Sequence, residues 1–172
     1  MSEKSILRGV LAGIAGGLAA SWVMNEFSAT VGEKLAETVE TPEEQQELKA
    51  QSDGEDATMK AADRIAETVT GGRHLTHEQR EIGGPIVHYA MGALAGGVYG
   101  ALAEYTDAAR AGFGTTFGGV LFATADLLAV PAFKLGGWPN EYPASSLVSP
   151  LAAHMVYGMT TELVRRLVRR VL

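Results

Sequence analysis

The chain contains no cysteine among its 172 residues, which excludes disulfide bridges and thiolate metal sites. It also lacks a positive net charge, because its 20 acidic residues outnumber its 14 lysines and arginines. A general nucleic-acid binder needs a basic face, so nucleic acid is not an expected partner. Aromatic residues make up only 7%, whereas glycine occurs 21 times. Such a mixture is typical of helices whose backbones pack closely within a membrane.

Charged residues are unevenly distributed along the chain, which makes the low mean hydropathy of +0.07 misleading. Four stretches hold no Asp, Glu, Lys or Arg apart from Asp126, namely 9–25, 85–103, 111–133 and 142–161. A membrane-spanning helix needs about 20 mostly apolar residues, and these stretches meet or approach that length. A soluble helical bundle would instead carry a polar stripe along every helix. The pattern therefore predicts membrane spans.

We expect an all-α fold, an integral membrane four-helix bundle that forms a single membrane domain over residues 1–172. The spans are expected at about 8–27, 85–103, 111–133 and 147–164. Basic residues gather at both ends of the chain, at Lys4, Arg8 and the arginines of 165–170. The positive-inside rule then places both termini in the cytoplasm. Residues 28–84 would form an acidic external cap between the first and second spans.

Local signals predict helices inside this external cap. Thr41-Pro42 has the form of a helix N-cap followed by proline at the first helical position. From 56 to 70 apolar residues recur at helical spacing, and Gly71-Gly72 should end that helix. Thr76 should cap one further short turn, and Gly83-Gly84-Pro85 should open the second span.

Glycines recur every fourth residue within three of the expected spans. Gly92, Gly96 and Gly100 form the series in the second span. The first span has a similar series over 9–17 and the third a shorter one over 114–118. Small residues at this spacing let helix backbones approach each other. The contact could join two copies of the chain in a homo-oligomer, but four helices in one chain favour packing within it.

Several motifs are similar to those of the YagU-like family of bacterial inner-membrane proteins. The resemblance covers nearly the whole chain and rests on the sequence segments 9–13, 22–25, 84–89, 99–104, 125–126, 130–132, 141–143, 151–158 and 161–166. It implies a bacterial inner (plasma) membrane location and the four-span architecture. The molecular function of the family is not established, so the resemblance implies no reaction.

Four ionisable residues are expected in the outer half of the bundle, and we treat them as a polar intramembrane cluster. They are Glu26, His88, Asp126 and His154. Asp126 and His154 each lie seven residues in from the link between the third and fourth spans, at a depth of about 10 Å. Spans joined by a short link pack as antiparallel neighbours, so these two side chains should lie close together. Placing an ionisable residue within a membrane costs free energy, so such residues are candidates for a functional role.

Three interpretations of this cluster remain open. Asp126 and His154 could form a hydrogen-bonded pair that fixes helix packing. The whole cluster could relay protons or bind a divalent metal, with His88, Asp126 and His154 as candidate ligands. Alternatively, His88 and His154 could be axial ligands of a haem. The first interpretation is favoured, so no cofactor is expected, and divalent metal and haem remain as alternatives.

No catalytic motif stands out, and the chain is not expected to be an enzyme. We expect an integral inner-membrane protein that is a structural or accessory membrane subunit. The alternative is a small transporter, or a proton- or metal-handling protein that uses the polar cluster. The expected partners are the lipid bilayer and, for an accessory subunit, other membrane proteins or a second copy of the chain.

Overall fold

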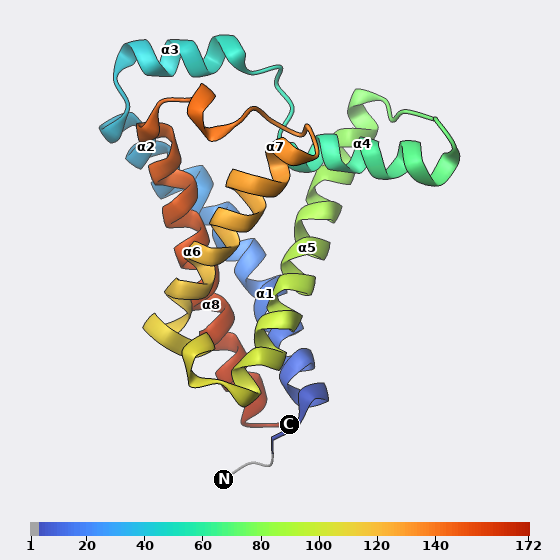
Figure 1. The fold of residues 1–172 in the computed structure, drawn as a ribbon, viewed down its shortest axis with the longest axis vertical. Coiled ribbons are helices and arrows are strands. Elements are labelled where there is room, and N and C mark those ends of the chain that lie inside the picture. Colours follow the sequence, from blue (N-terminus) through green and yellow to red (C-terminus); the bar gives the residue numbers. More distant parts are fainter. Residues whose placement is uncertain (1–3) are drawn as a thin grey trace.

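The computed structural model describes residues 4–172, and that part of the chain is helical, with no strand in it (Figure 1). Long helices run along the molecule as α1 (Ile6–Phe27), α5 (His77–Tyr105) and α8 (Val148–Arg169). A further helical run consists of α6 (Thr115–Thr124), the π-helical turn η3 (Ala125–Ala129) and α7 (Val130–Ala132). The all-α class expected from the sequence is confirmed.

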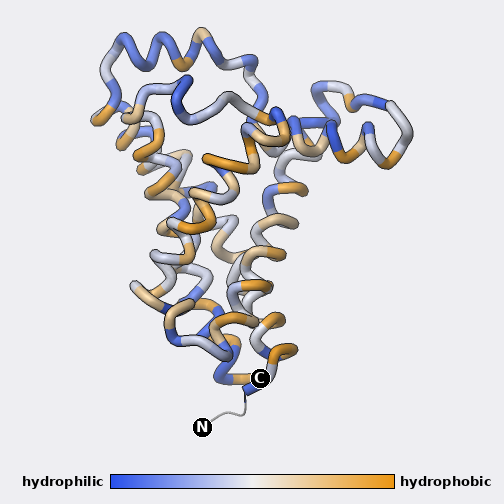
Figure 2. The backbone as a smooth tube through the Cα atoms, in the orientation of Figure 1, coloured by the Kyte–Doolittle hydropathy of each residue, from blue (hydrophilic) through white to orange (hydrophobic). Residues whose placement is uncertain are grey.

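Within residues 4–172, three helical segments are long and apolar enough to cross a membrane, which indicates a membrane protein. They are Ile6–Val39 with 34 residues, His77–Tyr105 with 29 and Asp107–Ala132 with 26. The fourth expected span falls in α8, whose apolar stretch ends at Glu162 and is followed by three arginines within the helix. The hydropathy-coloured trace shows polar residues gathered at the two ends of the long helices (Figure 2).

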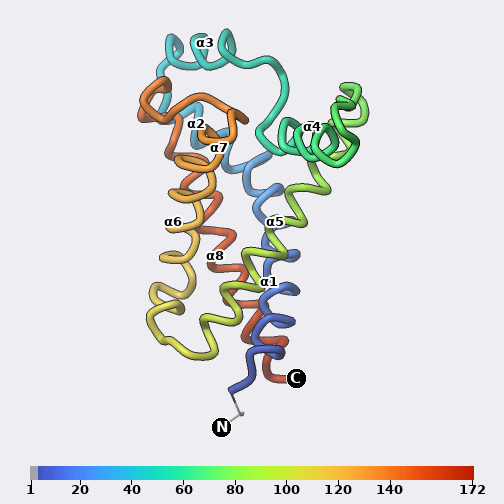
Figure 3. Tube along the Cα trace, turned by 45° about the vertical axis from the view of Figure 1, so that its right-hand side comes forward, coloured from blue at the N-terminus to red at the C-terminus, as the bar shows by residue number. Residues whose placement is uncertain are grey.

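Helix α1 is central to the packing, with α5 and α8 both in extensive contact with it. Helix α6 packs on α8, and the 3₁₀ segment η2 (Asp107–Gly114) connects α5 to α6 at the end where α8 finishes. From that connection α5 and α6 diverge, as two views of the trace show (Figures 1 and 3). The divergence leaves space between them in the opposite half of the molecule.

The predicted glycine series lies where α1 and α5 cross. A Cβ atom added at Gly96 would lie 2.7 Å from the Cα of Gly17 and would also meet the Gly13 carbonyl oxygen. One added at Gly100 would lie 2.8 Å from the Gly13 Cα. The Gly92 backbone lies against Ser21 and Gly17 in the same way. These glycines therefore pack within the chain, as the favoured interpretation expected.

The cap consists of three helices beyond the far end of the bundle. Helix α1 continues through a π-helical turn, Ser28–Gly32, into α2 (Glu33–Val39), and α3 (Pro42–Gln51) follows. Thr41 forms the predicted N-cap, where its hydroxyl accepts from the Glu44 amide and the Glu44 carboxylate accepts from the Thr41 amide. Helix α4 (Ala57–Thr70) ends at Gly71 in the left-handed conformation, as predicted. It projects sideways from α5 (Figure 1).

The predicted start of the second helix at 85 is wrong. Thr76 caps α5 itself, which runs unbroken from His77 through Pro85. The glycines before Pro85 instead make room for α4: a Cβ at Gly83 would lie 2.8 Å from the Ala62 Cβ, and one at Gly84 would lie 2.8 Å from the Met59 Cγ. A glycine pair in front of a proline thus marks a helix crossing here rather than a helix boundary.

The regular helix within the third expected span begins later than residue 111. The backbone is non-helical at Ala111, Gly112 and Phe113, so the regular helix starts at Thr115. Gly114 has a φ of +87°, and a Cβ there would collide with the Gly158 carbonyl of α8. The turn therefore requires glycine both for its backbone conformation and for the contact with α8.

Candidate functional site

The structure brings Asp126 and His154 together, as predicted. His154 lies on α8 and is 8% exposed, and its Nδ1 is 3.7 Å from the Asp126 Oδ2. The expected hydrogen bond between them is absent, because His154 Nδ1 donates to the Pro150 carbonyl at 2.9 Å. That bond places the Nδ1 proton and leaves Nε2 without a hydrogen in the neutral imidazole. The two side chains are therefore close in space, but no hydrogen bond joins them.

Asp126 owes its position to the π-helical turn η3, where the Val130 amide donates to the Ala125 carbonyl. Pro131 follows and has no N–H with which to continue a regular pattern. Such single wide turns within α-helices occur frequently at functional sites. The Asp126 side chain remains 36% exposed, and no hydrogen bond from the described residues reaches its carboxylate. It is available to a bound molecule.

His88 and Ser21 approach the same place from α5 and α1. The His88 Nε2 is 3.5 Å from the Ser21 carbonyl oxygen, at the outer limit of a hydrogen bond. Ser21 itself is 0% exposed, and its hydroxyl has no hydrogen-bond partner within the described part of the chain. The hydroxyl lies against the Gly92 backbone, which closes it off from the space around His88.

Glu26 does not belong to the cluster, and its predicted membership is wrong. Its side chain is exposed, and it does not line the space around Asp126 and His154. It follows Ser21 by five residues, which at about 100° per residue turns it roughly 140° away from the face that Ser21 occupies. Counting depth along a helix does not determine which way a side chain points.

A cavity of about 880 Å³ lies between the diverging α5 and α6, and the polar groups are in its wall. Helices α1 and α8 contribute Ser21, His154 and Tyr157, while α5 and η3 contribute His88 and Asp126. Apolar side chains make up most of the remaining wall, among them Val87, Met91, Ala95, Leu121 and Val130. The volume is that of a small-molecule pocket, and a mostly apolar wall with few polar groups is typical of one.

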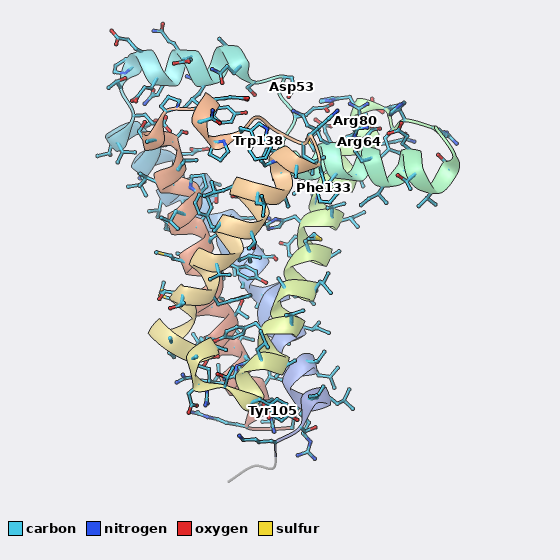
Figure 4. All side chains as sticks on the ribbon, in the orientation of Figure 1. Asp53, Arg64, Arg80, Tyr105, Phe133 and Trp138 are labelled. Atoms are coloured by element: carbon cyan, nitrogen blue, oxygen red, sulfur yellow. The ribbon has the colours of Figure 1, made fainter. Side chains whose placement is uncertain are left out.

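Helix α4 and the chain leaving α7 cover the cap end of this cavity. Arg64 and Ile65 of α4 line it together with Phe133 and Lys134. Figure 4 shows Arg64 and Phe133 at the place where α4 passes the end of α7. The two cationic side chains therefore lie at the cap end, away from Ser21 and His154 on the bundle helices.

The described residues include no group of three or more His, Asp or Glu side chains arranged to hold a metal ion. The candidate ligands His88, Asp126 and His154 are therefore not arranged as a metal site. The Asp126 carboxylate, 3.7 Å from His154 Nδ1, retains the capacity to accept hydrogen bonds from a ligand in the cavity.

A second polar group, at the end of the bundle opposite the cap, was not expected as a unit. Glu162 on α8 is 0% exposed and accepts from the Tyr99 hydroxyl at 2.8 Å and from Arg165 Nε at 2.7 Å. Nearby, Glu104 of α5 accepts two bonds from Arg169, at 2.7 and 3.0 Å. These bonds join α5 to α8 inside the bundle.

Ion pairs hold α4 against α5 at the cap. Hydrogen bonds from His74 and from the Leu75 amide lower the pKa of Asp63 from its ordinary value of 3.8. A hydrogen bond from His77, and then one from Arg80, lowers the pKa of Glu55 from 4.5. Both carboxylates are thus held in their charged form by groups of α5 and of the segment before it.

We predict that α4 loosens from α5 in acid. Because the folded pKa values lie below the unfolded ones, the carboxylates stabilise the docked cap fully above about pH 4.5. That stabilisation is lost as the pH falls from there through the lowered values. Spin labels on the substitutions Val69→Cys and Ile82→Cys should report a broadened distance below about pH 4. The chain has no native cysteine to interfere.

The control for this measurement is the labelled protein carrying Asp63→Asn and Glu55→Gln. Its distance distribution should already be broad at pH 7 and should change little on acidification. A narrow distribution in the unsubstituted cap down to pH 3 would contradict the role of the two carboxylates.

Comparison with known proteins finds no match to a family model, to a curated protein or to a solved structure.

Proposed function

We propose that this chain is a four-span protein of the bacterial inner membrane, with both termini in the cytoplasm and residues 28–84 outside. The support for α8 as the fourth span is its position along α1 and α6, and the pairing of its buried charges Glu162 and Arg165 with each other. A paired charge near the end of a helix is far less costly in a membrane than a lone one. The family proposal, YagU-like, remains supported by the motifs of the sequence.

The orientation follows from the charge at the two ends. Arg8 at the start of α1 and the arginines at the end of α8 lie at one end of the bundle, and acidic α3 lies beyond the other. The positive-inside rule places the arginine end in the cytoplasm.

Reporter fusions test this topology. A C-terminal reporter that is active only in the cytoplasm should be active, and one inserted at Asp53, an exposed residue between α3 and α4, should behave as external. Fusions with the reverse pattern would contradict the orientation. Two termini on opposite sides would contradict the fourth span.

Within this architecture we propose an accessory, non-enzymatic role in which the outer-half cavity binds a small molecule from the bilayer. The observation that carries the proposal is the apolar cavity of about 880 Å³ with the half-buried Asp126 carboxylate and the His88 and His154 rings in its wall. A purely structural subunit would have no need of such a space, and close packing would fill it. The transporter alternative would use the same cavity, and no further feature favours it.

A cavity-filling substitution tests the proposal. Ala95 faces the cavity from α5, so Ala95→Trp should occupy part of it. The neighbouring Leu94 is 62% exposed outside the cavity, and Leu94→Trp is the matched control. Organic extracts of the purified wild-type protein and of the control should contain a retained molecule that is depleted in the Ala95→Trp extract. Equal extracts from all three folded proteins would contradict a binding role.

A further inference from the structure

Helix α4 has two apolar surfaces, and only one of them is packed. Met59 and Ala62 are buried where α4 crosses α5. Ile65 and Val69 occupy a neighbouring side of the helix, and they are 54% and 80% exposed. Among the described residues, α5 is the one helix in extensive contact with α4. The second apolar surface is therefore left open to the surroundings of the protein.

The opposite side of α4 is polar and lies against the chain before and after the helix. The Lys60 Nζ is 2.9 Å from the Asp53 Oδ2, and the His74 Nδ1 is 2.9 Å from the Asp63 Oδ2. Glu67 is on this side too, with its Oε1 3.8 Å from the His74 Nε2. The segments that make these contacts are exposed loops. These ion pairs identify the side of α4 that faces water.

The exposed apolar side of α4 faces the bundle. Ile65 lines the cavity together with Val87 of α5 and Phe133. Val69 follows Ile65 by four residues and therefore lies on the same side, one turn farther along the helix. It is not part of the cavity wall, because α4 runs crosswise to the long helices and projects beyond α5 (Figures 1 and 3). Val69 thus faces the space alongside α5, which lipid occupies in a membrane.

The crossing of α4 and α5 lies at the level where the apolar surface of α5 begins. Between Glu81 and Glu104 the helix has no Asp, Glu, Lys or Arg. Gly84, at the crossing, precedes Glu104 by 20 residues. At about 1.5 Å per residue this is about 30 Å, the thickness of the hydrocarbon core of a bilayer. Large apolar side chains of this stretch are exposed toward its surroundings, namely Ile82, Ile86, Met91, Leu94, Val98 and Leu102.

The charges of α4 cancel, so apolar contact is its main attraction to a bilayer. Lys60 and Arg64 are balanced by Asp63 and Glu67 within the helix. A helix in the plane of the interface buries its apolar side at the boundary between headgroups and acyl chains, and anionic lipid adds attraction where the helix is basic. Arg64 borders the apolar side, and its long side chain can carry the guanidinium up to the level of the headgroups.

We propose that α4 is an interfacial helix that inserts Ile65 and Val69 into the cap-side leaflet of the bilayer. Lipid is the partner because this surface is continuous with the exposed apolar side of α5 and lies at the level where that side begins. Contact with the leaflet holds α4 across the cap end of the cavity, where Arg64 and Ile65 form part of the wall. The inference depends on the location of the chain in a membrane and is independent of what the cavity binds.

Nitroxide labels on single cysteines test this inference in the full chain, which has no native cysteine. Val69→Cys carries the label on the apolar side of α4, and Glu67→Cys is the matched control on the polar side of the same turn. Leu94→Cys on α5 reports the interior of the membrane. In phosphatidylcholine nanodiscs, oxygen should relax the labels of Val69→Cys and Leu94→Cys more strongly than a water-soluble nickel complex does. The order should be reversed for Glu67→Cys.

The other outcomes are distinguishable. Nickel that relaxes the Val69→Cys label as strongly as the Glu67→Cys label would place α4 in water and overturn the inference. A Val69→Cys label shielded from both reagents would show that protein, such as a second copy of the chain, covers this surface. Strong relaxation by nickel at Leu94→Cys would instead overturn the membrane span itself.

The headgroup charge of the lipid provides a second test. Nanodiscs of phosphatidylglycerol should give the same order of relaxation at Val69→Cys and Glu67→Cys, because α4 has no net charge. Insertion of Val69→Cys in phosphatidylglycerol alone would overturn apolar contact as its cause. Each labelled protein is first checked for native helicity and a monodisperse elution profile.

Discussion

Replacing Glu162 by leucine is expected to reduce the free energy of unfolding by about 3–5 kcal/mol, the usual cost of removing one partner from a buried ion pair. Glu162 is 0% exposed, and Arg165 beside it is 4% exposed. Without the carboxylate, the Arg165 guanidinium would keep a 4.0 Å approach to Glu104 and its position 6.0 Å from the Tyr99 ring centroid. The Tyr99 hydroxyl would lose its acceptor as well.

The surroundings of Glu162 make relief by water unfavourable. The Tyr99 ring stacks on Phe117 with 4.4 Å between ring centroids, and the Arg166 guanidinium lies 4.7 Å from the centroid of Phe113. Aromatic rings thus surround the charges on the side of η2 and α6. Moving them apart to admit water would sacrifice stacking and cation–π contacts together.

Two companion variants test the cause. Glu162→Leu combined with Arg165→Leu should recover much of the lost stability, because no uncompensated charge then remains buried. Asp107→Ala removes a carboxylate from an exposed pair with Arg110 and should cost less than about 1 kcal/mol. Unfolding by SDS titration in mixed micelles measures all three. A loss below about 1 kcal/mol for Glu162→Leu alone would show that water already solvates the pair.

The sequence predicted the helices of the cap well, because their ends depend on short-range chemistry. The Thr41 capping box, the α4 helix and its end at Gly71 are all local features. The start of α5 was misplaced because the same local reasoning treated Gly83 and Gly84 as helix breakers. Their role depends on α4, a helix whose position the local sequence does not reveal.

The candidate site was predicted in part, and the limit is helix rotation. The equal depth of Asp126 and His154 along their helices correctly predicted that they lie close together. Glu26 was included at a suitable depth but points away, and Ser21 was missed although it continues the four-residue series of Gly13 and Gly17. That series was the available signal, since the face of α1 that carries its glycines is the one that meets Gly92.

The polar group at the end of the bundle opposite the cap was overlooked for a different reason. Charges near the end of a helix are normally solvated anchors, and the spacing within α8 accounts only for the pairs of Glu162 with Arg165 and Arg166. Local spacing could not reveal that the Tyr99 hydroxyl, 63 positions earlier in the chain, donates a hydrogen bond to the Glu162 carboxylate.

Replacing glycine by alanine is predicted to have opposite effects at Gly119 on α6 and at Gly96, where α1 and α5 cross. Glycine in a helix interior is normally less favourable than alanine by about 0.5–1 kcal/mol, so a change to alanine should stabilise wherever space exists. Gly119 on α6 has nothing within 4 Å of an added Cβ. Gly119→Ala is therefore expected to leave the melting temperature in detergent unchanged or to raise it.

At Gly96 the added methyl group has no such space. It would lie 2.7 Å from the Gly17 Cα and 2.9 Å from the Gly17 amide nitrogen, and both are backbone atoms that cannot rotate away. The helices must separate, which costs about 1–3 kcal/mol for overpacking by a small group and opens the contacts at Gly92 and Gly100 in turn. Gly96→Ala should therefore lower the melting temperature, and Gly96→Leu should lower it further or prevent folding. A melting temperature that rises equally for Gly96→Ala and Gly119→Ala would place Gly96 against lipid and contradict the α1–α5 contact.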